Sequence, residues 1–219
     1  MKGGILAWRS ETSQSVVENK DLLNLVQWME TEVPRSKLFH LKFTEEQHKE
    51  ERYLAIIATF DKTGRCLDHS TKRSKDKKLW LSNNQAQKLK RQIEKDYLHA
   101  TGFNMADVKL YISDMGLIYG GQATQMVHND DLTEDFPEGW KQRQSIAAES
   151  GTILYGLKDD IKNRCRMHLA EDNDVERLKL VRVYKGMAVF FAGWVYHAGA
   201  NHGGRNASTR FYVDLCVMP

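Results

Sequence analysis

The sequence has few cysteines and few prolines, and both scarcities limit what the protein can be. Only three cysteines occur in 219 residues, at Cys66, Cys165 and Cys216. An odd number without a close pair predicts neither a disulfide framework nor a zinc knuckle. A reducing, intracellular compartment is therefore the expected location. With three prolines and 41% hydrophobic residues, the composition is that of a globular protein with a sizeable core.

Long hydrophobic runs are also missing. No apolar run approaches the roughly 20 residues that a membrane-spanning helix needs. Residues 1–8 are too short and too soon polar for a signal peptide. We therefore expect a soluble intracellular protein, in the cytoplasm or the nucleus, without a membrane partner. The sequence does not indicate an oligomeric state.

A strong net charge of one sign is absent as well. The net charge of +3 is too small to indicate a partner, but its distribution is uneven. Residues 71–95 hold nine Lys and Arg against Asp76 and Glu94, so this stretch carries +7 and the remainder −4. With Trp80 inside it, the stretch has the residue types that contact phosphates and stack on bases. A lysine-rich helix with a solvated face is the commoner explanation, and we prefer it.

The first half of the chain is predicted to be mixed and largely helical. Residues 21–29 and 84–99 have the apolar spacing of amphipathic helices. Residues 53–60 are rich in β-branched and aromatic side chains and predict a strand, with a weaker one at 37–42. A short charged helix is expected after Thr44. The predicted caps are Asn19 or Asp21 for the first helix, and Ser82 or Asn83 with Gly102 at the end of the second.

After residue 105 the pattern becomes that of short β-strands. Gly, Asn and Asp separate these segments at intervals typical of an antiparallel sandwich or barrel. Helices followed by strands predict an α+β fold. We place the boundary near residue 105 and expect the first part to pack on the second. The predicted strands are residues 108–112, 116–119, 123–127, 145–157, 178–184, 187–191 and 210–217.

Two histidines and an aspartate in the second half have the composition of a metal site. His128 and Asp130 are two residues apart, so on an extended segment their side chains lie on one side. His197 ends an apolar run, where a histidine is costly to bury unless it is hydrogen-bonded or metal-bound. Taken singly, these residues also suit a surface turn and a core histidine. Together they can form the two-His, one-carboxylate face of non-haem Fe(II) oxygenases.

An arginine follows the second histidine on a segment with strand alternation. Arg210 comes 13 residues after His197 and shares one face with Tyr212 and Asp214. Its guanidinium offers a planar fork for an acidic cosubstrate. Arg205 is the less favoured rival, because it lies in a glycine-rich sequence typical of a turn. In this order the HxD…H…R pattern, within about half of the chain, resembles the Fe(II)/2-oxoglutarate dioxygenase family.

The resemblance implies a fold and a metal. The fold is a double-stranded β-helix, a jelly-roll or cupin-like barrel, over residues 106–219. The helices of residues 1–105 would pack against it in one structural unit. Fe(II) would be held by His128, Asp130 and His197, which would be both metal ligands and catalytic residues.

The resemblance also implies a cosubstrate and a reaction. Arg210 would bind 2-oxoglutarate, a hydroxyl of Ser208 or its neighbour Thr209 would assist, and Tyr119 would place a phenol across the pocket. Ascorbate is a candidate reductant. Because halogenating members of the family lack the carboxylate that Asp130 supplies, we expect a hydroxylase that releases succinate and CO2. Demethylation and desaturation need the same site.

The substrate is left open by the sequence. Residues 198–201 resemble the loop after the distal histidine in the phytanoyl-CoA-hydroxylase-like branch, and a prolyl-hydroxylase-like branch is the other expectation. Arg205 and Arg210 loosely resemble the arginine pair of the nucleic-acid demethylase branch, but their spacing differs. We therefore expect a small molecule or a protein side chain rather than nucleic acid.

Two other functions are compatible with the sequence. A cupin-type metal enzyme without 2-oxoglutarate would not need Arg210 and would add a histidine, with His168 and His202 as candidates. A non-enzymatic β-barrel would bind nucleic acid through the basic residues 71–95 and would bind no iron.

Overall fold

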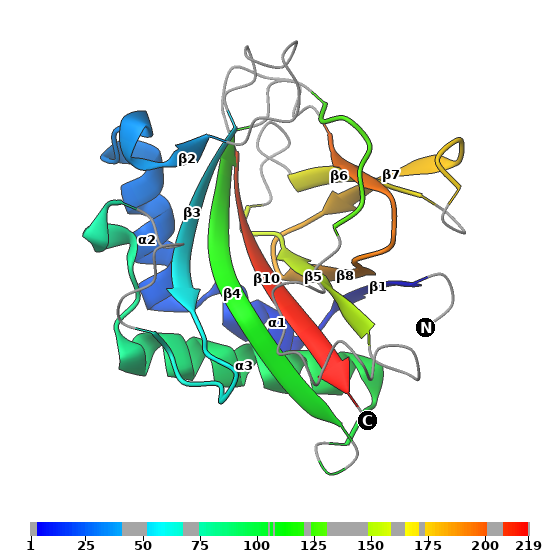
Figure 1. Cartoon of the computed structure of the whole chain (residues 1–219), viewed down its shortest axis with the longest axis horizontal. Helices are drawn as coiled ribbons and strands as arrows, with labels where there is room; N and C mark the ends of the chain where they lie inside the picture. The colour runs from blue at the N-terminus through cyan, green and yellow to red at the C-terminus, as the bar shows by residue number, and fades with distance from the viewer. Residues whose placement is uncertain are drawn as a thin grey trace.

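Two antiparallel sheets and three helices form the described part of this computed structural model (Figure 1). The structure describes residues 4–40, 52–67, 75–104, 106, 108–120, 124–130, 149–158, 165–170, 174–200 and 208–218. The helices are α1 (Glu11–Val17), α2 (Lys20–Thr31) and α3 (Asn83–Thr101), with 3₁₀ turns at Arg35–Lys37 and Lys77–Leu79. The strands are β1 (Ile5–Arg9), β2 (Phe39–His40), β3 (Arg52–Thr59), β4 (Lys109–Gly120), β5 (Glu149–Tyr155), β6 (Cys165–Ala170), β7 (Leu178–Val183), β8 (Met187–Ala192), β9 (His197–Gly199) and β10 (Ser208–Met218).

The larger sheet has seven strands in the order β1-β8-β5-β10-β4-β3-β2. The smaller sheet has the order β7-β6-β9. All strand pairs in both sheets are antiparallel. Figure 1 shows the helices on one side of the larger sheet and β6 and β7 on the other. The predicted α+β class is therefore confirmed.

The first part of the chain contributes strands to the same sheet. β1 pairs with β8 at one edge, and β3 pairs with β4 on the other side of β10. The predicted boundary at residue 105 thus lies between β3 and β4, two hydrogen-bonded neighbours. Both edges of the larger sheet come from residues before this boundary.

Local capping signals explain where the two long helices begin and end. Asn19 accepts hydrogen bonds from the backbone N–H groups at the start of α2. Ser82 and Gln85 form a reciprocal capping box at the start of α3. Gly102 ends α3 with a φ of 71°, a left-handed conformation that glycine adopts without a steric penalty. These caps and both helices agree with the sequence predictions.

A buried carboxylate fastens α3 to three other elements. Asp96 is fully buried and accepts four hydrogen bonds, of 2.8 to 3.0 Å. The donors are Trp8 at the end of β1, Ser10 and Thr12 at the start of α1, and Tyr155 on β5. Because a buried charge is costly without partners, this network fixes how the helix packs on the sheet.

Several strand and helix predictions differ from the structure. The predicted strands 108–112 and 116–119 are parts of one strand, β4, which begins at Lys109 and has a register irregularity opposite Asp214 and Leu215. α1, β1, β6 and β9 were not predicted, and the described residues 124–127 of the predicted strand 123–127 form no strand. The helix expected after Thr44 lies outside the described residues. In the described ranges we find no helix that could span a membrane.

The described part of the basic segment, residues 75–95, forms a 3₁₀ turn and most of α3. Lys78 Nζ lies 4.2 Å from the ring centroid of Trp28, while Leu79 and Leu81 are buried. Lys90 pairs with Glu94 one turn later on the helix. These contacts agree with a helix that has one packed face and one solvated face.

Candidate metal centre and cavity

His128 and His197 are 69 residues apart in sequence but directly opposite each other in the fold. The N–H of His128 donates to the carbonyl of His197 at 2.9 Å, and the reverse bond measures 2.7 Å. His197 begins β9, and His128 lies on the segment 124–130 beside it. Because Asp130 is two residues further along that segment, it returns to the side of His128.

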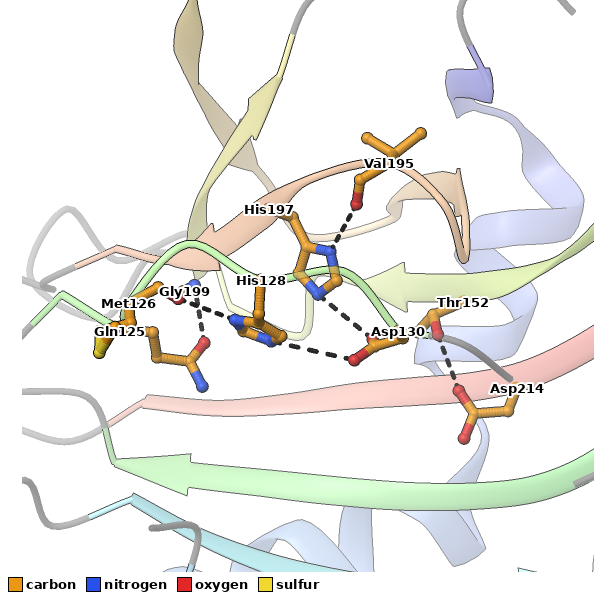
Figure 2. A network of polar contacts seen from close by, with 9 residues as sticks. All are labelled: Gln125, Met126, His128, Asp130, Thr152, Val195, His197, Gly199 and Asp214. Atoms are coloured by element: carbon orange, nitrogen blue, oxygen red, sulfur yellow. Dashed lines mark hydrogen bonds and ion pairs between the residues drawn. The ribbon is translucent and has the colours of Figure 1, made fainter. Parts of the chain in front are cut away.

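The three side chains converge in the way that a metal site requires (Figure 2). His197 Nε2 lies 3.2 Å from Asp130 Oδ2, and His128 Nε2 lies 3.9 Å from Asp130 Oδ1. One ligand atom from each residue lies within 4.8 Å of the others. The structure therefore brings together the three residues that the sequence singled out.

Backbone carbonyls fix the orientation of both imidazole rings. His128 Nδ1 lies 2.8 Å from the carbonyl of Met126, and His197 Nδ1 lies 3.0 Å from that of Val195. Since a carbonyl only accepts, each Nδ1 carries the hydrogen, so Nε2 is the nitrogen that ligates a metal when the ring is neutral. Both Nε2 atoms face the Asp130 carboxylate. This is the orientation that metal-binding histidines require.

Electrostatics favour the protonation states of metal ligands at His128 and Asp130. Burial lowers the pKa of His128, and the nearby His197 and Arg52 charges add to this effect. The hydrogen bond to Met126 and the charge of Asp130 act in the opposite direction but do not outweigh it. Burial alone would raise the pKa of Asp130. The hydrogen bond and charge of His197, with the charge of His128, outweigh burial and lower it. At neutral pH, His128 is thus neutral and Asp130 is ionised.

The three residues open into a cavity of about 280 Å³ between the two sheets. Its floor is the inner face of the larger sheet, where β3, β4, β10 and β5 lie side by side. Residues opposite each other on neighbouring strands point to the same side of a sheet. The floor residues form three rows of paired positions across these strands. The first row is Leu54, Ile118 and Arg210, the second is Leu154 and Tyr212, and the third is Thr152, Phe191 and Asp214.

Arg210 lies in this cavity with hydrogen-bonding capacity to spare. Only 2% of the residue is exposed. Among the described residues, its Nε and Nη2 have no hydrogen-bond partner. A buried guanidinium with unmet donors is unfavourable by itself, and an anion with two oxygens would satisfy it.

The structure does not bring Tyr119 to the cavity. Tyr119 follows Ile118 on β4, and its ring lies 3.8 Å from the guanidinium carbon of Arg35. Because Ile118 points into the cavity, the next side chain points away from it. The phenol that lines the cavity is that of Tyr212, whose ring passes over Gly116. A Cβ at Gly116 would come within 2.3 Å of that ring.

The hydroxyl expected beside the cosubstrate is constrained. The Ser208 side chain lies outside the described part, so its predicted role stays a prediction. Thr209 is buried and donates to Glu30 of α2 at 2.5 Å. This hydroxyl is therefore already engaged on the helix side of the sheet.

A second buried arginine lines the cavity and was not identified from the sequence. Arg52, at the start of β3, is 1% exposed. A Cβ at Gly199 would come within 2.1 Å of Arg52 Nη1 and 2.4 Å of Gln125 Oε1. Arg52 therefore lies beside Gly199, two residues after His197. Its place directly before the predicted strand of residues 53–60 was the only available signal.

The extra histidines of a cupin-type site are not found among the described residues. Only His128, Asp130 and His197 form a metal-binding group there. His168 is opposite Ala198 on the smaller sheet, and its neighbour Met167 lines the cavity instead. His202 lies outside the described part of the chain.

Comparison with known proteins gives matches at the level of structure. No family model matches the sequence, and no curated protein sequence matches it. A 2OG-Fe(II) oxygenase family oxidoreductase from Burkholderia pseudomallei superposes with a TM-score of 0.57 at 8% identity, over 98% of this chain and 86% of that chain.

Two further solved structures are similar over nearly the whole chain. The non-haem α-ketoglutarate-dependent epimerase SnoN of nogalamycin biosynthesis gives a TM-score of 0.59 at 10% identity, over 99% of this chain and 77% of that one. OsALKBH1 gives 0.51 at 10% identity, over 98% and 97%. At such identities the likeness establishes the fold. The chain thus has the double-stranded β-helix fold of the 2-oxoglutarate- and Fe(II)-dependent oxygenases, as the sequence predicted.

Proposed function

We propose that this protein is an Fe(II)- and 2-oxoglutarate-dependent oxygenase that hydroxylates its substrate with release of succinate and CO2. His128, Asp130 and His197 would hold Fe(II), and Arg210 would bind the distal carboxylate of 2-oxoglutarate. The observation that carries the proposal is that one cavity contains both a candidate metal site and a candidate anion site. Three potential metal ligands converge at one point, and a buried arginine in the same cavity has donors for an anion.

The residues present fit the metal. Two imidazole nitrogens and one carboxylate are the ligand set of a facial triad, which leaves the other positions open. Bound Fe(II), with 2-oxoglutarate and O2, supplies the oxidising power that breaks a C–H bond. The cavity geometry supports a catalytic metal site rather than a closed structural one, because the three ligands face an open cavity and not a packed core.

The surrounding residues would hold and shield the centre. The carbonyls of Met126 and Val195 keep both histidine rings in the ligating tautomer. Phe191 lies with its ring centroid 4.6 Å from that of His197 and covers it from one side. Leu154 and Met167 add apolar walls that exclude water.

We also propose that the substrate is a small molecule or a protein side chain. In the described part of the chain, no residue of the basic segment 75–95 lines the cavity. This segment forms most of α3, which contacts α1, and the 3₁₀ turn before it, which contacts α2. Nucleic acid bound there would not present a base to the triad without a further surface.

The first test is an anaerobic titration of the full chain with Fe(II) and then 2-oxoglutarate. We expect a weak visible charge-transfer band that needs both components and disappears in Asp130→Ala. His168→Ala is the matched control, and it should keep the band. Metal binding without a band, together with the loss of metal binding in His168→Ala, would favour the cupin-type enzyme. No metal binding at all would overturn both.

A further inference from the structure

The exposed side of α3 carries a row of basic side chains. Lys88, Arg91, Lys95 and His99 are all exposed, and they follow each other at a spacing of three or four residues. This spacing places them on one side of the helix. The ends of the row, Lys88 and His99, are 11 residues apart, which is about 16 Å along the helix axis. The row therefore presents positive charge along a line.

The acidic side chains of the same segment are used inside the fold. Asp96 is fully buried and accepts four hydrogen bonds. Asp76 is also buried, and its carboxylate caps the 3₁₀ turn before the helix. Glu94 is partly buried and pairs with Lys90. The net charge of this segment is visible in the sequence, but its concentration on one exposed side is not.

The two flanks of the row differ in charge. On the side of α1, Glu11 and Glu18 line a polar groove together with Lys88, so part of the charge is balanced there. On the other side, a hollow of about 340 Å³ separates α3 from the turn after β3 and from the start of β4. Its far rim carries two exposed lysines, Lys62 and Lys109. The positive charge thus continues across the hollow.

The cations on both sides of the hollow have no acidic partners. In the ranges that the structure describes, no carboxylate pairs with Arg91, Lys95 or Lys109. Asp61, the residue before Lys62, accepts three hydrogen bonds within its own turn. Exposed like charges that are not balanced attract a polyanion, which releases its counterions when it binds.

An exposed aromatic ring lies in the loop that joins the two walls of the hollow. Leu98 of α3 and Val108, just before β4, both line the hollow. Phe103 lies between them in the chain and is 43% exposed. An exposed aromatic ring close to cations is the combination that stacks on an unpaired base while the phosphates are neutralised. A single nucleic-acid strand has both features, and a flat anionic surface has only the charge.

The hollow is far from the candidate metal centre. Leu110 lines the hollow and Ile118 lines the cavity, and both belong to β4. Eight residues of strand separate them, a distance of about 26 Å. Figure 1 shows α3 near the end of the larger sheet at which β4 begins. A strand bound at the hollow would localise the protein without entering the cavity.

We propose that the exposed side of α3 and this hollow form a docking surface for single-stranded nucleic acid. Arg91 and Lys95 contact phosphates from the helix, and Lys62 and Lys109 contact them from the opposite rim. Phe103 stacks on a base at the end of the hollow. The bound strand is a partner of the protein and not its substrate.

The test measures binding of the full chain to a fluorescein-labelled oligo-thymidine of about 15 nucleotides by fluorescence anisotropy. With about four phosphate contacts, the logarithm of the association constant should fall with that of the salt concentration with a slope of about −3. Arg91→Gln and Lys109→Gln, from the two sides of the hollow, should each make the slope shallower by about 0.7. Phe103→Ala should weaken binding and leave the slope unchanged. Arg182→Gln, at an exposed arginine of β7, is the matched control and should change neither.

Four results would overturn the inference. The first is no binding at low salt, and the second is an unchanged slope in both Arg91→Gln and Lys109→Gln. The third is an equal effect of Arg182→Gln, which would show diffuse attraction to a basic protein. The fourth is displacement of the oligonucleotide by phosphatidylserine vesicles, poly-glutamate or the matching duplex at equal charge. That result would assign the surface to a membrane, an acidic peptide or duplex DNA.

This inference does not depend on the proposed function. The charge-transfer band of the Fe(II)–2-oxoglutarate complex is expected in all four variants, because none of the changed residues lines the cavity. Oligonucleotide binding is measured on the metal-free chain. Each proposal can therefore fail while the other holds.

Discussion

Thr209 Oγ1 donates a hydrogen bond of 2.5 Å to Glu30 Oε1, and this contact joins α2 to the strand that carries Arg210. Lys158 Nζ lies 2.8 and 2.6 Å from the two oxygens of the same carboxylate. The first helices are thus connected to the strand at the proposed cosubstrate end. Glu30 itself does not line the cavity.

We expect Glu30→Ala to weaken 2-oxoglutarate binding by up to about tenfold without changing Fe(II) affinity. Thr209 is buried and would lose its acceptor, so the start of β10 would become less ordered. Leaving that donor unsatisfied costs about 1–3 kcal/mol of folding free energy. Titration of each ligand and urea unfolding measure the two effects. Glu32→Ala, an exposed position at the end of the same helix, should change neither.

Arg210→Met should make the ligand-free protein as stable as the wild type or more stable. The substitution removes a buried charge with unmet donors and keeps much of the apolar volume. The same variant should lose 2-oxoglutarate binding while it still binds Fe(II). Thermal melting without ligands and the anaerobic titration test the two halves. A clear drop in melting temperature would show that the Arg210 guanidinium is satisfied within the fold.

Asp96→Asn should destabilise the protein by about 1–3 kcal/mol. The amide replaces one acceptor oxygen with an NH2 group that faces donors, and the indole N–H of Trp8 can only donate. Urea unfolding measures the change. Tyr155→Phe removes one of the four donors without adding an opposed one, so its loss should be smaller. Equal stability of Asp96→Asn and wild type would mean that the network contributes no net free energy.

Stability should fall as the pH rises above about 9. Burial raises the pKa of Cys216 to about 12, and burial with the nearby Asp96 carboxylate raises that of Tyr155 well above its ordinary value. The unfolded chain ionises at ordinary values, near 8.5 for a thiol and 10 for a phenol. The contribution of these two groups to folding stability is therefore fully present below their pKa values in the unfolded chain. It is lost as the pH rises towards their higher pKa values in the folded protein. Between pH 8 and 11, the free energy of unfolding should fall less steeply with pH in Cys216→Ala than in the wild type. The same pH dependence in both proteins would contradict the role of the thiol.

Local signals in the sequence were sufficient for the helices and for the triad. The cap and end of α3 are set by Ser82 and Gly102, whose effects act within one turn. The spacing of His128 and Asp130 places both side chains on one side of an extended segment without any knowledge of its partner. The identity of the facing residue, His197, followed from its setting in an apolar run. These features depend on contacts that are short in sequence or on one unusual residue.

The other residues that line the cavity could not be predicted in the same way, because strand register decides which side chains face it. β4 is largely buried on both faces, so no alternation of polar and apolar residues shows that Ile118, rather than Tyr119, faces the cavity. Arg52 reaches the site only because β3 pairs with β4 on the far side from β10. Its type is typical of a surface position, and nothing near it in sequence indicates burial.

The place of β10 between β5 and β4 has a consequence for synthesis of the protein. Without residues 208–218, the larger sheet is two separate halves, β1-β8-β5 and β4-β3-β2. Each half then exposes the unpaired edge that β10 later covers, and such edges invite pairing with other chains. While the ribosome still holds these residues, the nascent polypeptide has the segments that carry His128 and His197 but no joined sheet behind them. We therefore expect productive folding to follow release of this strand, and a holding chaperone to matter most just before it.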